Sequence, residues 1–182
     1  MRRGLFAHVM ADAEAQRAAG LVPGLRCAEV AEITDEGYVL EWSTGTVRSR
    51  SAPARQACFM AGDKRGAYFP LEIGDEVIVG FEEGNIDCPV ILGALYSDVD
   101  LPADGVDTSS SNNTRSIVSR AKSELSFDDS TGATRVLLKS AGGMELLMDD
   151  SAQTLTLKLN DNTKIELSAA GIKVVGTRID LN

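Results

Sequence analysis

Acidic side chains are the most frequent groups here that could perform chemistry, and several pairs of them are adjacent in sequence. Examples are Glu82 and Glu83, Asp128 and Asp129, and Asp149 and Asp150. A glycosidase needs two carboxyl groups about 5 to 10 Å apart in a cleft, which adjacent turn residues seldom provide. Aspartates in turns more often accept hydrogen bonds from the local backbone. We therefore interpret the pairs as turn residues.

No other pattern supports an enzyme. The run Ser109 to Ser111 lacks a G-x-S-x-G context, and the single histidine, His8, lies far from it in the sequence. The chain contains neither G-x-x-x-x-G-K nor G-x-G-x-x-G, the loops that hold phosphates. We expect a protein that is not an enzyme, with no cofactor, no metal ligands and no catalytic residues.

The three cysteines, Cys27, Cys58 and Cys88, form no C-x-x-C pair, and one stays unpaired if two join. One interpretation is small buried hydrophobic residues in a reducing compartment. The other is a disulfide formed late, within or between chains. The spacing does not decide between them.

The charge balance argues against nucleic acid as a partner. The 182 residues include 27 acidic and 18 basic side chains, a formal net charge of −9, so the average surface repels a phosphate backbone. A local basic stretch of Arg48, Arg50 and Arg55 is expected to face an acidic neighbour or solvent. The longest apolar runs are too short to form a membrane-spanning helix.

Residues 1–20 are predicted to form an amphipathic helix. Leu5, Phe6, Val9 and Met10 share one face of it, and Gly20 ends it. This apolar stripe either covers the base of the following domain or docks onto a partner protein.

Residues 21–96 are expected to form a small closed β-barrel. Short apolar runs, each bounded by Gly, Pro or Asp, predict about five strands, at 27–33, 38–42, 57–61, 75–81 and 88–96. Closure removes the exposed edges of so small a sheet.

Residues 97–114 have the composition of a linker, and residues 115–182 predict a ladder of short strands separated by turns. Apolar residues alternate with polar ones throughout the ladder, so one face of every strand is apolar and the other is expected to meet water. The predicted apolar core consists of Val136, Leu138, Met144, Leu146, Met148, Leu155, Leu157, Leu159, Ile165, Leu167, Ile172 and Val174.

No helix in this segment can cover the apolar face, and no second set of strands can form a thick sandwich with it. Copies of the same segment from other chains are the natural cover. Several identical chains around a common axis would bury the face, pair the strand edges and form a stiff rod.

The segment FPLEIGDEVIVGFEEGNIDCPVILGALYS resembles the signature of contractile-tail spike proteins, such as phage baseplate assembly protein V and the spike domain of VgrG proteins of type VI secretion. The resemblance rests on Pro70, Gly74, Asp75, Glu76, Val77, Phe81, Gly84, Pro89, Val90, Ile91, Leu92, Gly93 and Tyr96.

A second segment, TRSIVSRAKSELSFDDSTGATRVLLKS, resembles the entry into the needle of that family. The matching residues are Arg115, Ser116, Ser119, Leu125, Phe127, Asp128, Asp129, Gly132, Arg135 and Leu138. The resemblance implies an all-β fold: an OB-fold barrel, then an intertwined triple-stranded β-helix formed by a homotrimer.

Differences from the family narrow the expected role. The sequence has no large N-terminal hub domain and no lysozyme-like insertion at 97–114. The resemblance therefore implies a separate hub or tube-initiator protein, for which Leu5, Phe6, Val9 and Met10 are the docking candidates. The end VVGTRIDLN lacks the His-x-His pair that holds iron in some spikes, so a small PAAR-like tip protein is expected to contact Ile179, Leu181 and Asn182.

The sequence thus predicts a rigid trimeric needle at the centre of a contractile tail or injection machine. Its partners would be itself, the hub, the tip protein and, transiently, the target cell envelope. It would be assembled in the bacterial cytoplasm and carried in a virion or injection particle. The alternative is a free-standing OB-type binding module with a β-sandwich tail. An OB fold that binds single-stranded nucleic acid would need rings such as Trp42, Tyr38 and Phe59 beside the arginines, and the net charge opposes that function.

Overall fold

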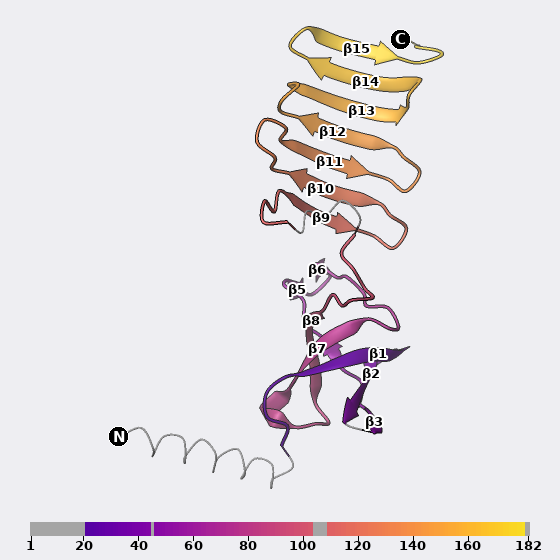
Figure 1. The fold of residues 1–182 in the computed structure, drawn as a ribbon. Coiled ribbons are helices and arrows are strands. Elements are labelled where there is room, and N and C mark those ends of the chain that lie inside the picture. Colours follow the sequence, from indigo (N-terminus) through magenta and orange to yellow (C-terminus); the bar gives the residue numbers. More distant parts are fainter. Residues whose placement is uncertain (1–20, 45, 104–108, 181–182) are drawn as a thin grey trace. The chain divides into compact units, whose positions relative to one another are not determined.

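The computed structural model describes residues 21–44, 46–103 and 109–180. The helix predicted for residues 1–20 lies outside them. The chain divides into two compact units, Met1–Leu101 and Pro102–Asn182. The described elements are strands apart from one 3-10 turn, Glu82–Gly84, so the fold is all-β (Figure 1).

The first unit contains a six-stranded sheet in the order β3-β2-β1-β7-β8-β4. Neighbouring strands run antiparallel except β4 and β8, which are parallel. The strands of this sheet are β1 (Arg26–Thr34), β2 (Gly37–Thr44), β3 (Val47–Arg50), β4 (Arg55–Gln56), β7 (Glu76–Phe81) and β8 (Pro89–Ala94).

A bridge between Tyr38, near the start of β2, and Ala54, just before β4, closes this sheet into a barrel. The Tyr38 amide donates to the Ala54 carbonyl at 3.0 Å, and the Ala54 amide donates to the Tyr38 carbonyl at 2.8 Å. Gly37 permits this approach, since a Cβ there would lie 2.4 Å from the Ala54 oxygen and its φ is +142°. Closure leaves the small sheet with little free edge.

The barrel has a continuous apolar core because apolar residues alternate along its strands. Val30, Leu40, Val77, Val79 and Ile91 are completely buried. Buried residues at their edges are Ala28, Tyr38, Trp42, Ala54 and Leu71. Trp42 packs edge-on against Phe81, with ring centroids 6.2 Å apart. The barrel therefore encloses its core within one chain.

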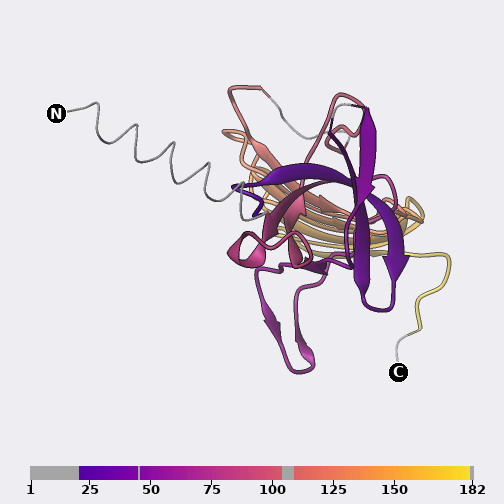
Figure 2. The same ribbon diagram turned by 90° about the horizontal axis from the view of Figure 1, so that it is seen from below.

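The strand predicted at 57–61 is wrong. Residues 57–60 are not in a strand; they lead into a short hairpin of β5 (Ala61–Gly62) and β6 (Arg65–Gly66) that projects from the barrel (Figure 2). The middle of the apolar run there lacks a neighbouring strand and leaves Phe59 and Met60 exposed. The pattern of apolar residues did not distinguish a buried strand from an exposed arm.

The second unit contains a seven-stranded antiparallel sheet in which each strand pairs with the next one in sequence. No described helix covers either face. The strands are β9 (Thr114–Val118), β10 (Glu124–Asp128), β11 (Arg135–Lys139), β12 (Glu145–Asp149), β13 (Thr154–Asn160), β14 (Thr163–Ser168) and β15 (Gly171–Val175). Figure 1 shows this simple meander in orange to yellow. Within the described ranges, no helix has the length and hydropathy required to cross a membrane.

Candidate functional site

The register of the second sheet aligns its apolar residues in two columns that cross all the strands. The first column contains Ile117, Leu125, Leu138, Leu146, Leu157, Ile165 and Val174. The second column starts at Arg115 and continues through Phe127, Val136, Met148, Leu155, Leu167 and Ile172. Side chains facing one another across adjacent strands pack directly. The sheet thus presents a single apolar face.

This face is uncovered. Leu157 is 55% exposed and Ile172 is 71% exposed, and none of the described hydrophobic side chains of the second unit is buried. Ten of the twelve predicted core residues lie in the two columns. Met144 immediately precedes β12, and Leu159 lies at a bulge between Lys158 and Asn160. Ile117 was not predicted to lie in the core, because the only apolar residues of its strand, Ile117 and Val118, are adjacent and show no alternation.

The opposite face is polar but not uniformly so. Glu145 lies 3.8 Å from both Lys139 and Lys158, and Lys158 also lies 3.0 Å from Asp161. These ion pairs compensate the charged side chains within the sheet, so this face can remain in water without a partner protein. Leu137 and Leu147 face each other on this side and are partly buried. The expectation of a wholly water-facing surface is wrong at these two positions.

The carboxylates that are adjacent in sequence accept hydrogen bonds from turn residues and form ion pairs. One oxygen of Asp149 accepts from the Ala152 amide at 2.9 Å and the Ser151 hydroxyl at 2.7 Å, and the other accepts from Arg135 at 2.9 Å. These donors, the Ala152 amide first, hold the pKa of Asp149 below its usual value. Asp128 accepts from the Ser130 amide at 2.9 Å. Their geometry is that of turn residues, as the sequence suggested.

The predicted tip-contact residue Ile179 is 52% exposed. It lines a hollow of about 270 Å³ beside the apolar columns, together with Leu157, Ile165 and Val174. The neighbouring Arg178 donates to Asp180 at 2.8 Å. The other two candidates, Leu181 and Asn182, lie outside the described residues, as do the predicted hub-docking residues Leu5, Phe6, Val9 and Met10.

The arginines of the barrel are paired within the chain. Arg48 contacts Glu41 at 2.7 Å, Arg50 lies 3.6 Å from both Glu32 and Glu41, and Arg55 contacts Glu82. Each therefore faces an acidic neighbour, one of the two predicted environments. Arg26 covers the Trp42 ring at 5.6 Å, which places a side chain where a base would stack. This arrangement does not form a basic groove.

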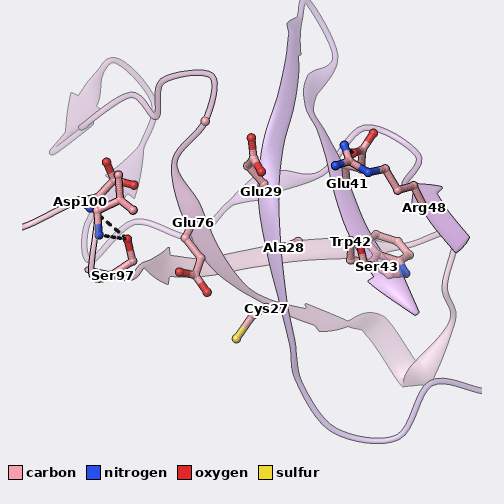
Figure 3. A pocket seen from close by; sticks show the side chains of 12 residues that line it. Cys27, Ala28, Glu29, Glu41, Trp42, Ser43, Arg48, Glu76, Ser97 and Asp100 are labelled. Atoms are coloured by element: carbon pink, nitrogen blue, oxygen red, sulfur yellow. Dashed lines mark hydrogen bonds and ion pairs between the residues drawn. The ribbon is translucent and has the colours of Figure 1, made fainter. Parts of the chain in front are cut away.

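A hollow of about 380 Å³ on the barrel surface is acidic (Figure 3). Glu41, Glu29 and Glu76 lie directly opposite one another on β2, β1 and β7. Like charges facing each other across strands repel. Glu41 is compensated by Arg48 and Arg50, whereas the described residues offer no ion pair to Glu29 or Glu76. Asp100 adds a fourth carboxylate to the lining.

Cys27 also lines this hollow and is exposed, as is Cys88; Cys58 is partly buried. All three thiols are free. The interpretation as buried hydrophobic residues is therefore wrong for Cys27 and Cys88, because each lies at the barrel surface. Across the described ranges, no group of three or more His, Cys, Asp or Glu side chains has the arrangement of a metal site.

Sequence reasoning missed an exposed apolar patch on the hairpin arm. Phe59 is 82% exposed, Tyr68 is 66% exposed, and Phe59 stacks on Phe69 with ring centroids 6.5 Å apart. Met60 is exposed beside them. Aromatic residues on both sides of the turn Gly-Asp-Lys-Arg-Gly were the available signal. Such a patch on a barrel with a complete core indicates an interaction surface.

Residues 38–96 match the family model of the type VI secretion system/phage-baseplate injector OB domain. The comparison with curated proteins gave no match. The family match supports the predicted baseplate family at a coarse level and assigns an OB domain to the barrel. It indicates a structural role in a phage or type VI secretion baseplate, in a family that is structural rather than enzymatic.

Proposed function

We propose that this chain is the central spike of a contractile injection machine. In this proposal three copies wrap their β9 to β15 segments around a common axis as an intertwined triple-stranded β-helix, in the manner of VgrG-like spikes. The barrels sit at the base of the resulting needle. The needle punctures the target cell envelope when the sheath contracts.

The two uncovered apolar columns are the observation that carries this proposal. A large contiguous apolar surface on a soluble chain marks an interaction site. Both columns extend over every strand from β10 to β15, so the partner must be as long as the sheet itself. Another copy of the same segment has the required length, spacing and apolar character. The OB-domain match to a baseplate family supports the same role.

The proposed work is mechanical. A needle has to resist bending and unfolding while it is driven through an envelope, and no bond has to be made or broken. A shared core of Leu, Ile, Val and Met, with no free strand edge, provides this resistance. The outward polar face, with its cross-strand ion pairs, would keep the rod in water as it passes lipid and peptidoglycan.

Attachment completes the proposal. The apolar stripe of Leu5, Phe6, Val9 and Met10 would dock onto a hub or tube-initiator protein above the barrels. A small PAAR-like protein would cap the other end at Ile179, Leu181 and Asn182. The spike would assemble in the bacterial cytoplasm and leave it within a virion or injection particle. The proposal requires no cofactor and no catalytic residue.

Light scattering of the purified full-length chain tests the proposal. We expect a mass of three chains, and we expect the association to weaken or vanish in a chain that ends before Arg115. A stable monomer at micromolar concentration would overturn the spike assignment. In that case the barrel would be an OB-type module on its own.

Attachment to the hub is tested separately by Phe6→Asp. We expect this variant to remain a trimer and to lose its binding to the purified hub protein, because interface energy concentrates on aromatic and aliphatic anchors. Loss of the trimer would instead mean that residues 1–20 pack within the spike.

A further inference from the structure

The hairpin arm, residues 57–70, is firmly held at its base. The Tyr68 hydroxyl lies 3.0 Å from that of the buried Tyr38, and this hydrogen bond raises the pKa of Tyr68. Gln56 Nε2 donates to the Phe69 carbonyl at 2.9 Å, and the Ala67 amide donates to the Met60 carbonyl at 3.0 Å. The arm therefore presents its exposed side chains in a fixed geometry, which lowers the entropy cost of binding.

The tip of the arm carries the opposite charge to the rest of the barrel. Lys64 lies in the turn and Arg65 begins β6; with Asp63 beside them they give the arm a net charge of +1, and the described residues form no ion pair with either cation. Elsewhere in 21–56 and 71–101 the sequence holds thirteen acidic residues against four basic ones. The arm thus combines aromatic and cationic groups, the side chains enriched where binding energy concentrates. Its partner must be acidic, with apolar surface beside the charges.

The acidic hollow of the same barrel has this chemistry. Its lining combines Glu29, Glu76 and Asp100 with apolar surface from Ala28, Trp42 and Val99. Glu29 and Glu76 repel each other across β1 and β7, an arrangement that a folded chain keeps at some cost. Arg48 also lines the hollow but is paired with Glu41, and the described residues form no ion pair with Glu29 or Glu76. Figure 3 shows Glu29, Glu41 and Glu76 on these neighbouring strands. An incoming Lys or Arg would relieve the repulsion.

We propose that the hairpin arm of one copy docks into the acidic hollow of a neighbouring copy, with Lys64 and Arg65 facing Glu29 and Glu76. No residue of the arm lines this hollow in its own chain, so the cations come from another chain. The two surfaces differ, so the contact runs head to tail and closes into a ring at three copies. The inference rests on the proposed trimeric spike and adds a second interface, between barrels.

Disulfide trapping tests the contact in the full-length chain. Cys27 already lines the hollow, so only a second thiol on the arm is needed. The variant carries Arg65→Cys, with Cys58→Ser and Cys88→Ser to remove the other thiols. Its mass is measured by light scattering, and it is then oxidised with copper phenanthroline and separated on a non-reducing denaturing gel. We expect covalent dimers and trimers, with no larger species.

The matched control replaces Arg65→Cys by Asp87→Cys, an exposed position on the loop before β8. It should form few covalent trimers. In the trapping background, Lys64→Glu should lower the trimer yield, and Glu76→Lys added to the same chain should restore it. Restoration separates a direct charge contact from a general loss of folding.

The two proposals fail differently. Trapping no greater than in the control, in a sample with the mass of three chains, would overturn the docking of the arm and leave the spike standing. The arm would then belong to the surface that meets another baseplate protein. A ladder of covalent species beyond three chains would also overturn the closed ring. A monomeric mass before oxidation would overturn the spike itself.

Discussion

The two units differ in how they satisfy their apolar residues. The barrel buries Val30, Leu40 and Ile91 completely within one chain, whereas the second sheet pairs its backbone regularly and leaves both apolar columns exposed. Backbone pairing alone therefore does not make a stable fold, since it needs a covered apolar face to offset the loss of conformational entropy. The stability of the barrel should be intrinsic, and that of the second sheet, in the proposed trimer, should depend on chain concentration.

The largest expected effect comes from a charge in the apolar columns. Leu157→Asp should abolish the proposed trimer, because each chain would lose about 2–5 kcal/mol of leucine burial in it and would also have to desolvate a carboxylate. Light scattering and concentration-dependent thermal unfolding measure it. Thr156→Asp, the adjacent residue on the opposite face, should remain trimeric. Equal loss of the trimer in both variants would contradict an apolar interface on this face.

A cavity in the barrel should have a smaller effect of a different kind. Ile91→Ala should lower the free energy of unfolding of the barrel by about 2–5 kcal/mol, the range for a buried Ile. Urea unfolding followed by Trp42 fluorescence should give this loss at every protein concentration. Val47→Ala, at a position 61% exposed, should change it by less than about 0.5 kcal/mol. A concentration-dependent loss for Ile91→Ala would mean that the barrel, too, depends on its partners.

Closure of the barrel can be weakened at one glycine. Gly37→Ala should cost about 1–3 kcal/mol, the range for a strained backbone, because its Cβ would meet the Ala54 carbonyl. Gly80→Ala is the matched control, since the added Cβ would meet only side-chain atoms at 3.5 Å or more. Urea unfolding that gives the same midpoint for both variants would show that the Tyr38 to Ala54 bridge does not limit barrel stability.

The smallest effect concerns the dependence of the stability of the second sheet on pH. The pKa of Asp149 is depressed in the folded chain, so its stabilisation is present above the pKa of an unfolded aspartate, about 3.9, and is lost as the pH falls through the folded value. Asp149→Asn should therefore reduce the loss of stability of the second sheet on acidification. Thermal unfolding between pH 7 and pH 3 measures this. A pH profile of Asp149→Asn identical to that of the wild type would contradict a stabilising role for this carboxylate.

Periodicity predicted the second sheet better than the barrel. Strict alternation at residues such as Leu155 and Leu157 identifies both the strands and their apolar face, and the pairing of successive strands follows from the short turns. Leu137 and Leu147 escaped this reasoning because three apolar residues in a row do not reveal which one faces the other side. The register that aligns the columns became visible only in the structure.

In the barrel, short sequence patterns gave wrong predictions where contacts between residues distant in the sequence decide the structure. The run 57–61 is apolar enough for one strand, but only its ends pair, Ala57 with Ile91 of β8 and Ala61 with Gly66 of β6, so residues 58–60 lead into the arm instead. The closure through Gly37 and Ala54 joins residues far apart in the sheet order, which no short window of sequence contains. The acidic row of Glu29, Glu41 and Glu76 likewise arises only once β1, β2 and β7 are side by side.

The uniform strand pairing of the second sheet also makes its length adjustable in fixed steps. Each strand adds about 4.7–4.9 Å to the length of the sheet. Because neighbouring strands are antiparallel, a deletion that keeps the direction of the following strands must remove two of them. The smallest such deletion shortens the sheet by about 10 Å. Residues 154–170, for instance, contain β13, β14 and the turn to β15, and their loss would bring β12 beside β15 with both columns still in line. In the proposed spike, reach across envelopes of different thickness would thus change by duplication or deletion of about 20 residues, without redesign of the interface.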